Sequence, residues 1–450
     1  MAVTVGMISL GCPKNQVDAE IMLADLKKQG FKIVCDPAQA QVVVINTCGF
    51  IEAAKQESID QILEMGLLKK EGRIKRIIVT GCLAERYREE LMQQLPEVDV
   101  VLGIGSNREL CEAITQSVQG AEPCCRFGPK QALALEGDRV LTTLPFTAYL
   151  KIAEGCDNRC TYCAIPSIRG AFRSRTLESI SAEAEALVEN GVRELVLVAQ
   201  DTTRYGLDLY GKPQLAVLLR RLNKIEKLRW IRILYAYPEM VDDELIDAMA
   251  SLEKVVPYLD IPIQHSNDEV LRRMNRRGGE KMIRELIAHL RGKIPDIVLR
   301  TTVITGFPGE TEQQFCELCE FLKQARFERL GCFAYSREEG TPAADFPDQI
   351  DPQVAQRRAD TIMTAQQRVM DAYLEKMQDR VLTVAVEGYD RYAGCYFGRS
   401  AYDAPDIDGK IFMASARPLQ VGDFVSVKIT DSMDCDLLGE VVRDSEGESL

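Results

Sequence analysis

Three cysteines stand close together near the middle of the chain, at Cys156, Cys160 and Cys163. They follow the apolar run 148–153, so a strand would deliver all three thiols into one short loop. Three thiolates at C-x-x-x-C-x-x-C spacing suit three irons of a 4Fe–4S cluster and leave the fourth iron open. An open iron can bind a reactant, which is what reductive cleavage of S-adenosylmethionine requires. The spacing therefore predicts a cluster that binds this cofactor.

A structural zinc site is the alternative for this loop. Zinc in such a site normally takes four Cys or His ligands. No fourth ligand follows nearby, because the only histidines are His265 and His289 and the next cysteine is Cys316. The spacing favours the iron–sulfur cluster over zinc.

Three further cysteines each follow a predicted strand in the first part of the chain. Residues 3–105 alternate short apolar runs with amphipathic stretches, which is typical of a parallel sheet covered by helices. The predicted strands are 3–10, 41–46, 76–80 and 98–102. Cys12, Cys48 and Cys82 follow the first three of them, each beside a glycine. Because ligands gather at the carboxyl ends of parallel strands, we expect a second cluster with an open iron there. Three ordinary buried cysteines are the alternative.

Two more sheets are predicted after an irregular stretch. Six βα units form a partial barrel, whose site should lie at the carboxyl ends of its strands. These strands are expected at 147–152, 194–199, 230–235, 258–261, 298–304 and 329–335. A charged stretch, 352–378, predicts a long exit helix, and after residue 380 the period changes to two, as in a small five-stranded antiparallel barrel. We therefore predict an α/β chain of four parts: a sheet domain at 1–120, a linker at 121–141, the partial barrel with its exit helix at 142–379, and the small barrel at 380–450.

Composition narrows the class of protein. Hydrophobic residues make up 46% and charged residues 27% of the chain, with no apolar run of ~20 residues, so we expect a soluble protein outside the membrane. No signal peptide is read, and fifteen cysteines in a cytoplasmic chain favour metal binding over disulfides. The net charge of −13 disfavours binding of nucleic acid through neutralisation of many backbone phosphates. The part after residue 379 has seven Lys and Arg against thirteen Asp and Glu, which favours a basic protein partner.

Several motifs, taken together, resemble the methylthiotransferases of the radical S-adenosylmethionine superfamily. They are Leu10 to Asp18, Cys48 with Cys82, Gly155 to Pro166, Gly306 to Thr311 and the terminal barrel, which is TRAM-like. The resemblance covers nearly the whole chain. Gly11 to Asn15 and Ile165 to Gly170 are similar to the branch that modifies a ribosomal protein, whereas the tRNA branch typically has Gln-Met in place of Pro13 and Lys14.

The resemblance implies conversion of a C–H bond into C–S–CH3 at the β-carbon of an aspartate in small-subunit ribosomal protein twelve. It implies two 4Fe–4S clusters and two molecules of S-adenosylmethionine. Cys156, Cys160 and Cys163 would hold the cluster that cleaves S-adenosylmethionine, and Cys12, Cys48 and Cys82 an auxiliary cluster that carries the sulfur. A tRNA-adenosine methylthiotransferase and a non-catalytic iron–sulfur scaffold or electron carrier are the alternatives.

Partners also follow from the resemblance. They are the basic ribosomal protein, engaged through the acidic terminal barrel, a reductant such as flavodoxin or ferredoxin, and a sulfur donor.

Five residues outside the cysteine motifs are candidates for contacts with S-adenosylmethionine. They are Tyr162 in the cysteine loop, Gln200 and Asp201 after the second barrel strand, Arg300 on the fifth strand and Tyr335 after the sixth. Each also has a structural interpretation as a packed aromatic, a loop cap or a strand arginine. His265, after the fourth strand, is a further candidate.

A basic stretch follows the fourth barrel strand. It is expected to form a solvated helix face, with a docking patch as the alternative, and its members are Arg272, Arg273, Arg276 and Arg277.

Overall fold

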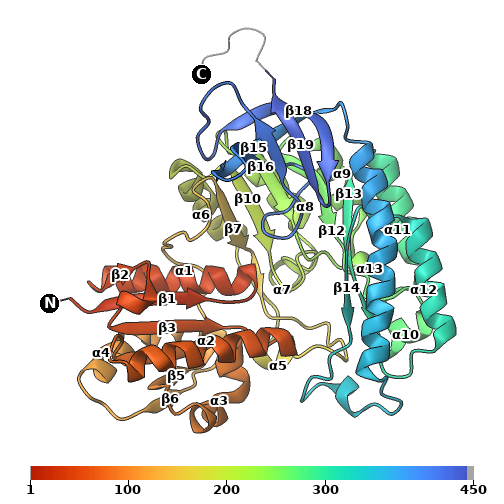
Figure 1. Ribbon diagram of the computed structural model, residues 1–450. Coiled ribbons are helices and arrows are strands. Elements are labelled where there is room, and N and C mark those ends of the chain that lie inside the picture. Colours follow the sequence, from red (N-terminus) through yellow and green to blue (C-terminus); the bar gives the residue numbers. More distant parts are fainter. Residues whose placement is uncertain (1, 443–450) are drawn as a thin grey trace.

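The computed structural model describes residues 2–442, and its strands form three large sheets and one small ribbon (Figure 1). The first sheet and the partial barrel are both parallel, and the third sheet closes on itself. The predicted fold class is confirmed. Within the described range, no helix is both long enough and apolar enough to cross a membrane.

The first sheet has the strand order β2-β1-β3-β4-β5-β6. Its strands are β1 (Thr4–Ser9), β2 (Lys32–Val34), β3 (Val42–Thr47), β4 (Arg76–Gly81), β5 (Val100–Leu102) and β6 (Cys124–Arg126). Its helices are α1 (Pro13–Lys28), α2 (Glu52–Lys70), α3 (Cys82–Gln94) and α4 (Leu110–Val118). Buried Val and Ile side chains on both faces pack against α1 and α4 on one side and α2 and α3 on the other. Burial on both faces explains why these strands read as continuous apolar runs.

Two edge strands, β2 and β6, were not predicted from the sequence. Each has only three residues and pairs with one neighbour, so neither leaves a clear apolar pattern in the sequence. The strand β6 lies inside the stretch 121–141 that was predicted to be a linker. The first sheet therefore extends further along the chain than its composition indicates.

The second sheet is the partial barrel, with the strand order β14-β13-β12-β11-β10-β7. Its strands are β7 (Thr147–Lys151), β10 (Glu194–Val198), β11 (Trp230–Ile233), β12 (Val255–Asp260), β13 (Val298–Thr305) and β14 (Arg329–Ala334). Its helices are α5 (Ile165–Arg169), α6 (Leu177–Glu189), α7 (Leu207–Tyr210), α8 (Leu215–Leu222), α9 (Asp243–Ser251), α10 (Asp268–Arg273), α11 (Glu280–Lys293), α12 (Glu312–Ala325) and α13 (Pro352–Glu375). The predicted six-stranded barrel and its exit helix, α13, are present.

A short antiparallel ribbon closes the base of the cysteine loop. It pairs β8 (Ala153–Glu154) with β9 (Arg173–Ser174). The amide of Cys156 also donates to the carbonyl of Gly170 across 3.1 Å. Backbone hydrogen bonds alone therefore fix both ends of the loop that carries the three cysteines.

The third sheet is a closed barrel with the order β15-β16-β17-β19-β18. Its strands are β15 (Val381–Asp390), β16 (Cys395–Ser400), β17 (Ile411–Ala414), β18 (Phe424–Met433) and β19 (Asp436–Val441). Neighbours are antiparallel, as predicted, except that β17 and β19 run parallel. The strand β17 does not pair with β18, the next strand in the chain, because β19 lies between them. The strand β19 runs antiparallel to β18 and parallel to β17.

The terminal barrel packs on the amino-terminal ends of the partial-barrel strands, at the top of Figure 1. Arg399 of β16 pairs with Glu194, the first residue of β10, and Arg329 at the start of β14 pairs with Asp403 across 2.5 Å. All four side chains are buried. The carboxyl ends of the same strands point toward the first sheet, so the terminal barrel and the cysteine loop lie at opposite ends of the partial barrel.

Candidate active site between the two parallel sheets

The first set of thiols lies at the carboxyl edge of the first sheet. Cys12 is the N-cap residue of α1, Cys48 directly follows β3, and Cys82 is the first residue of α3. Gly11 has φ 91°, and a Cβ placed on it would lie 3.0 Å from the sulfur of Cys48. The loop after β1 thus approaches Cys48 closely. The structure brings these thiols to one edge, as the strand positions predicted.

Gly81 is what allows the third thiol to join the other two. Its φ is 96°, and an added Cβ would stand 2.4 Å from the carbonyl oxygen of Thr47. Only glycine combines this left-handed backbone with such a close approach. The end of β4 can therefore lie against the end of β3, which places Cys82 beside Cys48.

Burial raises the pKa of two of these thiols, Cys48 and Cys82. The pKa of Cys82 rises to about 12 mainly through burial, with Cys12 and Cys48 adding to the effect, and burial also raises the pKa of Cys48. Without metal, these two thiols are therefore protonated near neutral pH. Because thiolate is the metal-binding form, loading of this site must release protons.

The second set of thiols lies in the loop after β7 and β8. Cys156 and Cys160 are buried and Cys163 is half-buried. The amide of Cys163 donates to the carbonyl of Cys160 across 3.0 Å, which makes a tight turn. Burial raises the pKa of Cys156 to about 11 and raises that of Cys163, with Cys160 contributing in both cases.

Both thiol sets fit a cubane cluster better than a single metal ion. Within residues 2–442, no three Cys, His, Asp or Glu side chains are placed to share one ion. A zinc ion would require its ligands at about 2.3 Å from one centre. In a cubane each thiolate binds a different iron, so wider spacing is suitable. The donor chemistry, three thiols per set, agrees with two clusters.

A buried ionic network joins the two sets. The Arg169 guanidinium, at the end of α5, donates to Asp18 across 2.8 Å and to Glu154 across 2.9 Å. It also lies 3.5 Å from the sulfur of Cys82. Lys151 bonds to the same two carboxylates. The network therefore ties α1 and α3 of the first sheet to the cysteine loop of the barrel.

The network also fixes the charge of Glu154, two residues before Cys156. Burial opposes ionisation of Glu154, but Arg169 and Lys151 lower its pKa to about 2. Gln200 donates to its second oxygen across 2.6 Å. The ionised carboxylate thus accepts bonds from three side chains at the base of the cysteine loop.

Gln200 and Asp201, which follow β10 as predicted, contact the cysteine loop and the residue at its base, Glu154. The carbonyl oxygen of the Gln200 side chain is buried and lacks a partner among the described residues, so it can accept a bond from a ligand. Asp201 accepts from Asn158 of the loop across 2.8 Å and from Thr203. Asp201 is fully buried, so it orients the loop.

Two aromatic candidates pack near the cysteine loop. Tyr162 contacts Phe307 and Met274, and Cys160 is among the groups that raise its pKa, after burial. Tyr335 packs edge-to-face on Phe307 at 5.5 Å, and its hydroxyl is buried without a partner in the described part of the chain. Both rings therefore belong to the apolar cluster around Phe307, and Tyr162 itself is part of the cysteine loop.

The side chains of two other candidates, Arg300 and His265, already form bonds with neighbouring residues. Arg300 pairs with Asp260 across 3.2 Å and faces Asp408 of the terminal barrel, so its charge is already compensated. His265 is fully buried, with Nε2 3.2 Å from Glu310 and Nδ1 accepting from the amide of Asn267. Both nitrogens are engaged, which favours the structural interpretation of His265.

Arg276 departs from the predicted solvated face. The residue is only 6% exposed, its guanidinium lies 4.0 Å from the ring centre of Tyr237, and one guanidinium nitrogen has no partner among the described residues. Tyr237 in turn lies 3.8 Å from the sulfur of Cys160. Sequence reasoning missed this placement because four arginines in one stretch resemble a charged surface. The interruption by Met274, which is buried, is the signal that could have shown it.

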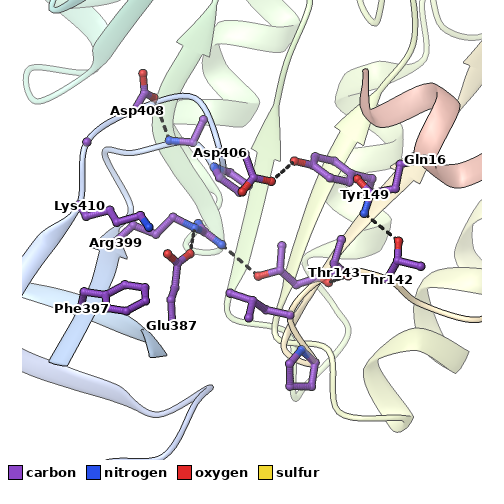
Figure 2. Close-up of a pocket in the computed structure, with 16 residues that line it drawn as sticks. Gln16, Thr142, Thr143, Tyr149, Glu387, Phe397, Arg399, Asp406, Asp408 and Lys410 are labelled. Carbon is purple, nitrogen blue, oxygen red and sulfur yellow. Dashed lines mark hydrogen bonds and ion pairs between the residues drawn. The ribbon is translucent and has the colours of Figure 1, made fainter. Parts of the chain in front are cut away.

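A separate cavity of about 700 Å³ lies where α1, the segment 142–145 and the terminal barrel meet (Figure 2). Its charged side chains mostly pair with each other: Arg399 with Glu387, and Asp406 with the hydroxyl of Tyr149. None of the six cluster cysteines lines it. We therefore place the candidate active site at the two thiol sets and not in this cavity.

Family profiles match all three sheets. The profile of the radical SAM superfamily matches residues 150–322, that of "Uncharacterized protein family UPF0004" matches 4–103, and that of the TRAM domain matches 380–442. A solved structure of the radical S-adenosylmethionine methyltransferase TsrM from Kitasatospora setae aligns with a TM-score of 0.58 at 15% identity. The alignment covers 76% of this chain and 77% of that one, and it supports the fold alone. The fold and the site define a radical S-adenosylmethionine enzyme with a terminal TRAM domain.

Full-length relatives narrow this class. The "Ribosomal protein uS12 methylthiotransferase RimO" of Desulforamulus reducens is 49% identical over 98% of this chain and 100% of its own length. That of Geobacter sulfurreducens is 50% identical over 97% of this chain and 98% of its own. The chain belongs to the RimO family. It is a methylthiotransferase that uses 4Fe–4S clusters and S-adenosylmethionine, which confirms the predicted family, enzyme class and cofactors.

Proposed function

We propose that this enzyme adds a methylthio group to the β-carbon of an aspartate in ribosomal protein uS12. The proposal is supported by relatives that are named as uS12 methylthiotransferases and are 49% and 50% identical to this chain over nearly its full length. The relatives reported above are named for a ribosomal protein, so the tRNA-adenosine alternative has less support. Because its substrate is a ribosomal protein, we place the reaction in the cytoplasm.

In this proposal each of the two thiol sets holds a cluster with a different role. Cys156, Cys160 and Cys163 hold the cluster that binds S-adenosylmethionine, and the other set, at the edge of the first sheet, holds the auxiliary cluster. When bound, the cofactors supply the electron, the radical that removes a substrate hydrogen, the sulfur and the methyl group. The protein positions these reactants and excludes water from the radical.

The chain's own residues supply that positioning. Asp201 fixes the cysteine loop through Asn158, and Arg169 ties the loop to the edge that carries Cys82. Arg169 also forms ion pairs with Asp18 and Glu154, and because all three side chains are buried, solvent screens these pairs little. Tyr162, Gln200 and Tyr335 are the proposed contacts for S-adenosylmethionine. Arg300 is a weaker candidate because Asp260 already compensates its charge.

The remaining partners are proposed from charge and redox chemistry. The acidic terminal barrel is the proposed contact for the basic ribosomal protein, at the end of the partial barrel opposite the cysteine loop. It would hold a part of the substrate away from the modified aspartate. A flavodoxin or ferredoxin would supply electrons, and a separate donor would restore the sulfur.

Mass spectrometry of uS12 tests the proposal. Cells that carry the gene should contain uS12 whose aspartate peptide is heavier by one carbon, two hydrogens and one sulfur, and cells without it should not. Complementation with the Cys156→Ala enzyme is the matched control and should not restore the mass. Unmodified uS12 together with a 2-methylthio nucleoside in digested tRNA would favour the tRNA alternative. No S-adenosylmethionine turnover under reducing conditions would favour a scaffold or carrier.

A further inference from the structure

Arg86 forms a second buried link between the first sheet and the partial barrel, and this link shares no residue with the Arg169 network. Arg86 belongs to α3, one helical turn after Cys82. Its guanidinium pairs with the carboxylate of Glu338 across 2.8 Å and donates to the carbonyl of Glu339, also across 2.8 Å. Both glutamates lie in the segment that follows β14, the last strand of the partial barrel. The side chains of Arg86 and Glu338 are 8% and 4% exposed, so solvent screens the pair little.

The same guanidinium contacts the loop that carries Cys48. It donates to the carbonyl of Gly49, the residue after Cys48, across 2.9 Å. A Cβ placed on Gly49 would lie 2.7 Å from the Cα of Leu83, so the chain after β3 lies directly against the start of α3. Arg86 therefore bonds at once to the loop of the first thiol set and to the segment after β14.

The segment after β14 in turn contacts the cysteine loop. The amide of Ala343, which is fully buried, donates to the carbonyl of Thr161 across 2.9 Å, and Thr161 directly follows Cys160. Between these contacts, the hydroxyl of Thr341 donates to the carbonyl of Glu338 across 2.7 Å and closes a tight turn. A continuous series of bonds thus leads from the loop of the first thiol set to the loop of the second.

We propose that Arg86 is a positioning residue for methylthio transfer, because its guanidinium fixes the Cys48 loop relative to the cysteine loop. This inference rests on the proposed function, in which the first thiol set holds the sulfur and the radical forms at the second. Transfer then depends on how the two sets are placed, and a shift of ~1 Å in a reacting group can cost about 100-fold in rate.

The alternative is that Arg86 only stabilises the interface through its ion pair with Glu338. Lys55 of α2 separates the two interpretations, because its ammonium pairs with the same carboxylate across 3.1 Å. Its other partners are Glu52 and the hydroxyl of Tyr87, and it donates to no backbone carbonyl among the residues that the structure describes. Lys55 therefore shares the ion pairing of Arg86 but not its bond to the Cys48 loop.

Arg86→Lys is the variant that tests positioning. A lysine keeps the charge that pairs with Glu338, but one ammonium cannot reproduce the planar fork that reaches Gly49, Glu338 and Glu339 together. This variant should fold and hold about eight irons per chain, as the wild type should. The matched control is Lys55→Met, which removes one charge from Glu338 and leaves every bond of Arg86 in place.

Two measurements on the cluster-loaded enzyme compare these variants. The first is the electron paramagnetic resonance spectrum with both clusters reduced, in which the dipolar interaction between the clusters falls with the cube of their distance. Arg86→Lys should change this interaction, and Lys55→Met should keep the wild-type spectrum. The second is the amount of 5′-deoxyadenosine formed per methylthiolated uS12, which should rise about tenfold in Arg86→Lys and stay within about twofold of wild type in Lys55→Met.

Each outcome supports or overturns the role of Arg86. A wild-type spectrum in Arg86→Lys overturns it, and so does an unchanged ratio of 5′-deoxyadenosine to product. Equal changes in both variants would show that ion pairing with Glu338 is what matters, and loss of iron in Arg86→Lys would make Arg86 a residue of the fold; either result overturns positioning. Wild-type enzyme that leaves uS12 unmodified overturns the proposed function, whereas the spectra, which need no uS12, still decide whether Arg86 positions the two sets.

Discussion

The guanidinium of Arg169 lies 3.5 Å from the sulfur of Cys82, although 87 residues separate them in the chain. Arg169 belongs to α5 in the barrel and Cys82 begins α3 in the first sheet, and the two helices pack together through Ile168 and Ala164. This contact is where the two parallel sheets meet at their carboxyl ends. The contact holds the edge that carries Cys82 against the barrel helix that follows the cysteine loop.

Replacing Arg169 should destabilise that interface strongly. Arg169→Ala would leave Asp18 and Glu154 buried with only Lys151 to compensate them, and removing one partner of a buried ion pair typically costs about 3–5 kcal/mol. Urea denaturation should show a lower midpoint. The matched control is Arg220→Ala, whose pair with Glu244 is 2.7 Å long but exposed, and its effect should stay below about 1 kcal/mol. Equal shifts for both variants would contradict a structural role for Arg169.

The two thiol sets should be separable by mutation. Cys48→Ala should lower the iron content from about eight to about four per chain and stop methylthio transfer, while 5′-deoxyadenosine still forms. Cys156→Ala should lose the same amount of iron and also abolish 5′-deoxyadenosine. Cys35→Ala changes an exposed cysteine outside both sets and should retain all the iron. If Cys48→Ala still made methylthiolated product, the auxiliary role would be wrong.

Gly81 offers a test of the geometry that gathers the first set. Gly81→Ala would push a methyl group to within 2.4 Å of the Thr47 carbonyl and so displace Cys82. We expect loss of the auxiliary cluster's iron. Gly72→Ala is the control, because Gly72 also has a positive φ, 75°, but an added Cβ meets nothing within 4 Å. It should cost about 1–2 kcal/mol of backbone strain and keep the iron. Iron analysis and thermal melting distinguish the two.

The sequence predicted the parts of the fold that repeat and the thiols that follow strands. Strands buried on both faces leave continuous apolar runs, which is why β1, β3 and β4 and the strands of the partial barrel were found close to their actual bounds. Because Cys12, Cys48 and Cys82 each follow such a strand within three residues, their meeting at one edge could also be inferred. The short edge strands β2 and β6 have no such pattern.

Contacts between the sheets could not be predicted in the same way. Nothing in the local sequence distinguishes Arg169, which is buried between carboxylates, from the exposed Arg220. Lys14 likewise appeared only as part of a motif, which gave no sign of its contact with the ring of the barrel residue Tyr235. Side chains that act between domains depend on how the domains pack, and periodicity carries no information about that packing.

Glu194 should make attachment of the terminal barrel dependent on pH. Burial would raise the pKa of Glu194, but Arg399 and Arg232 lower it below the ordinary value. Its contribution to stability is therefore fully present above the unfolded value of about 4.3 and is lost as the pH falls below it toward the lowered pKa. Trp230, the only tryptophan, lies 4.8 Å from Phe424 of the terminal barrel, so its fluorescence reports on this contact.

Thermal unfolding followed by Trp230 fluorescence between about pH 6 and pH 3 measures the effect. The wild-type midpoint should fall steeply below about pH 4.3. Glu194→Gln removes the charge at every pH, so its midpoint should be lower near neutral pH and should change less on acidification. The matched control is Glu244→Gln, which breaks only an exposed pair and should follow the wild-type curve. Parallel curves for wild type and Glu194→Gln would show that this carboxylate does not hold the terminal barrel, because a group whose pKa differs between the folded and unfolded protein must change the pH dependence of stability.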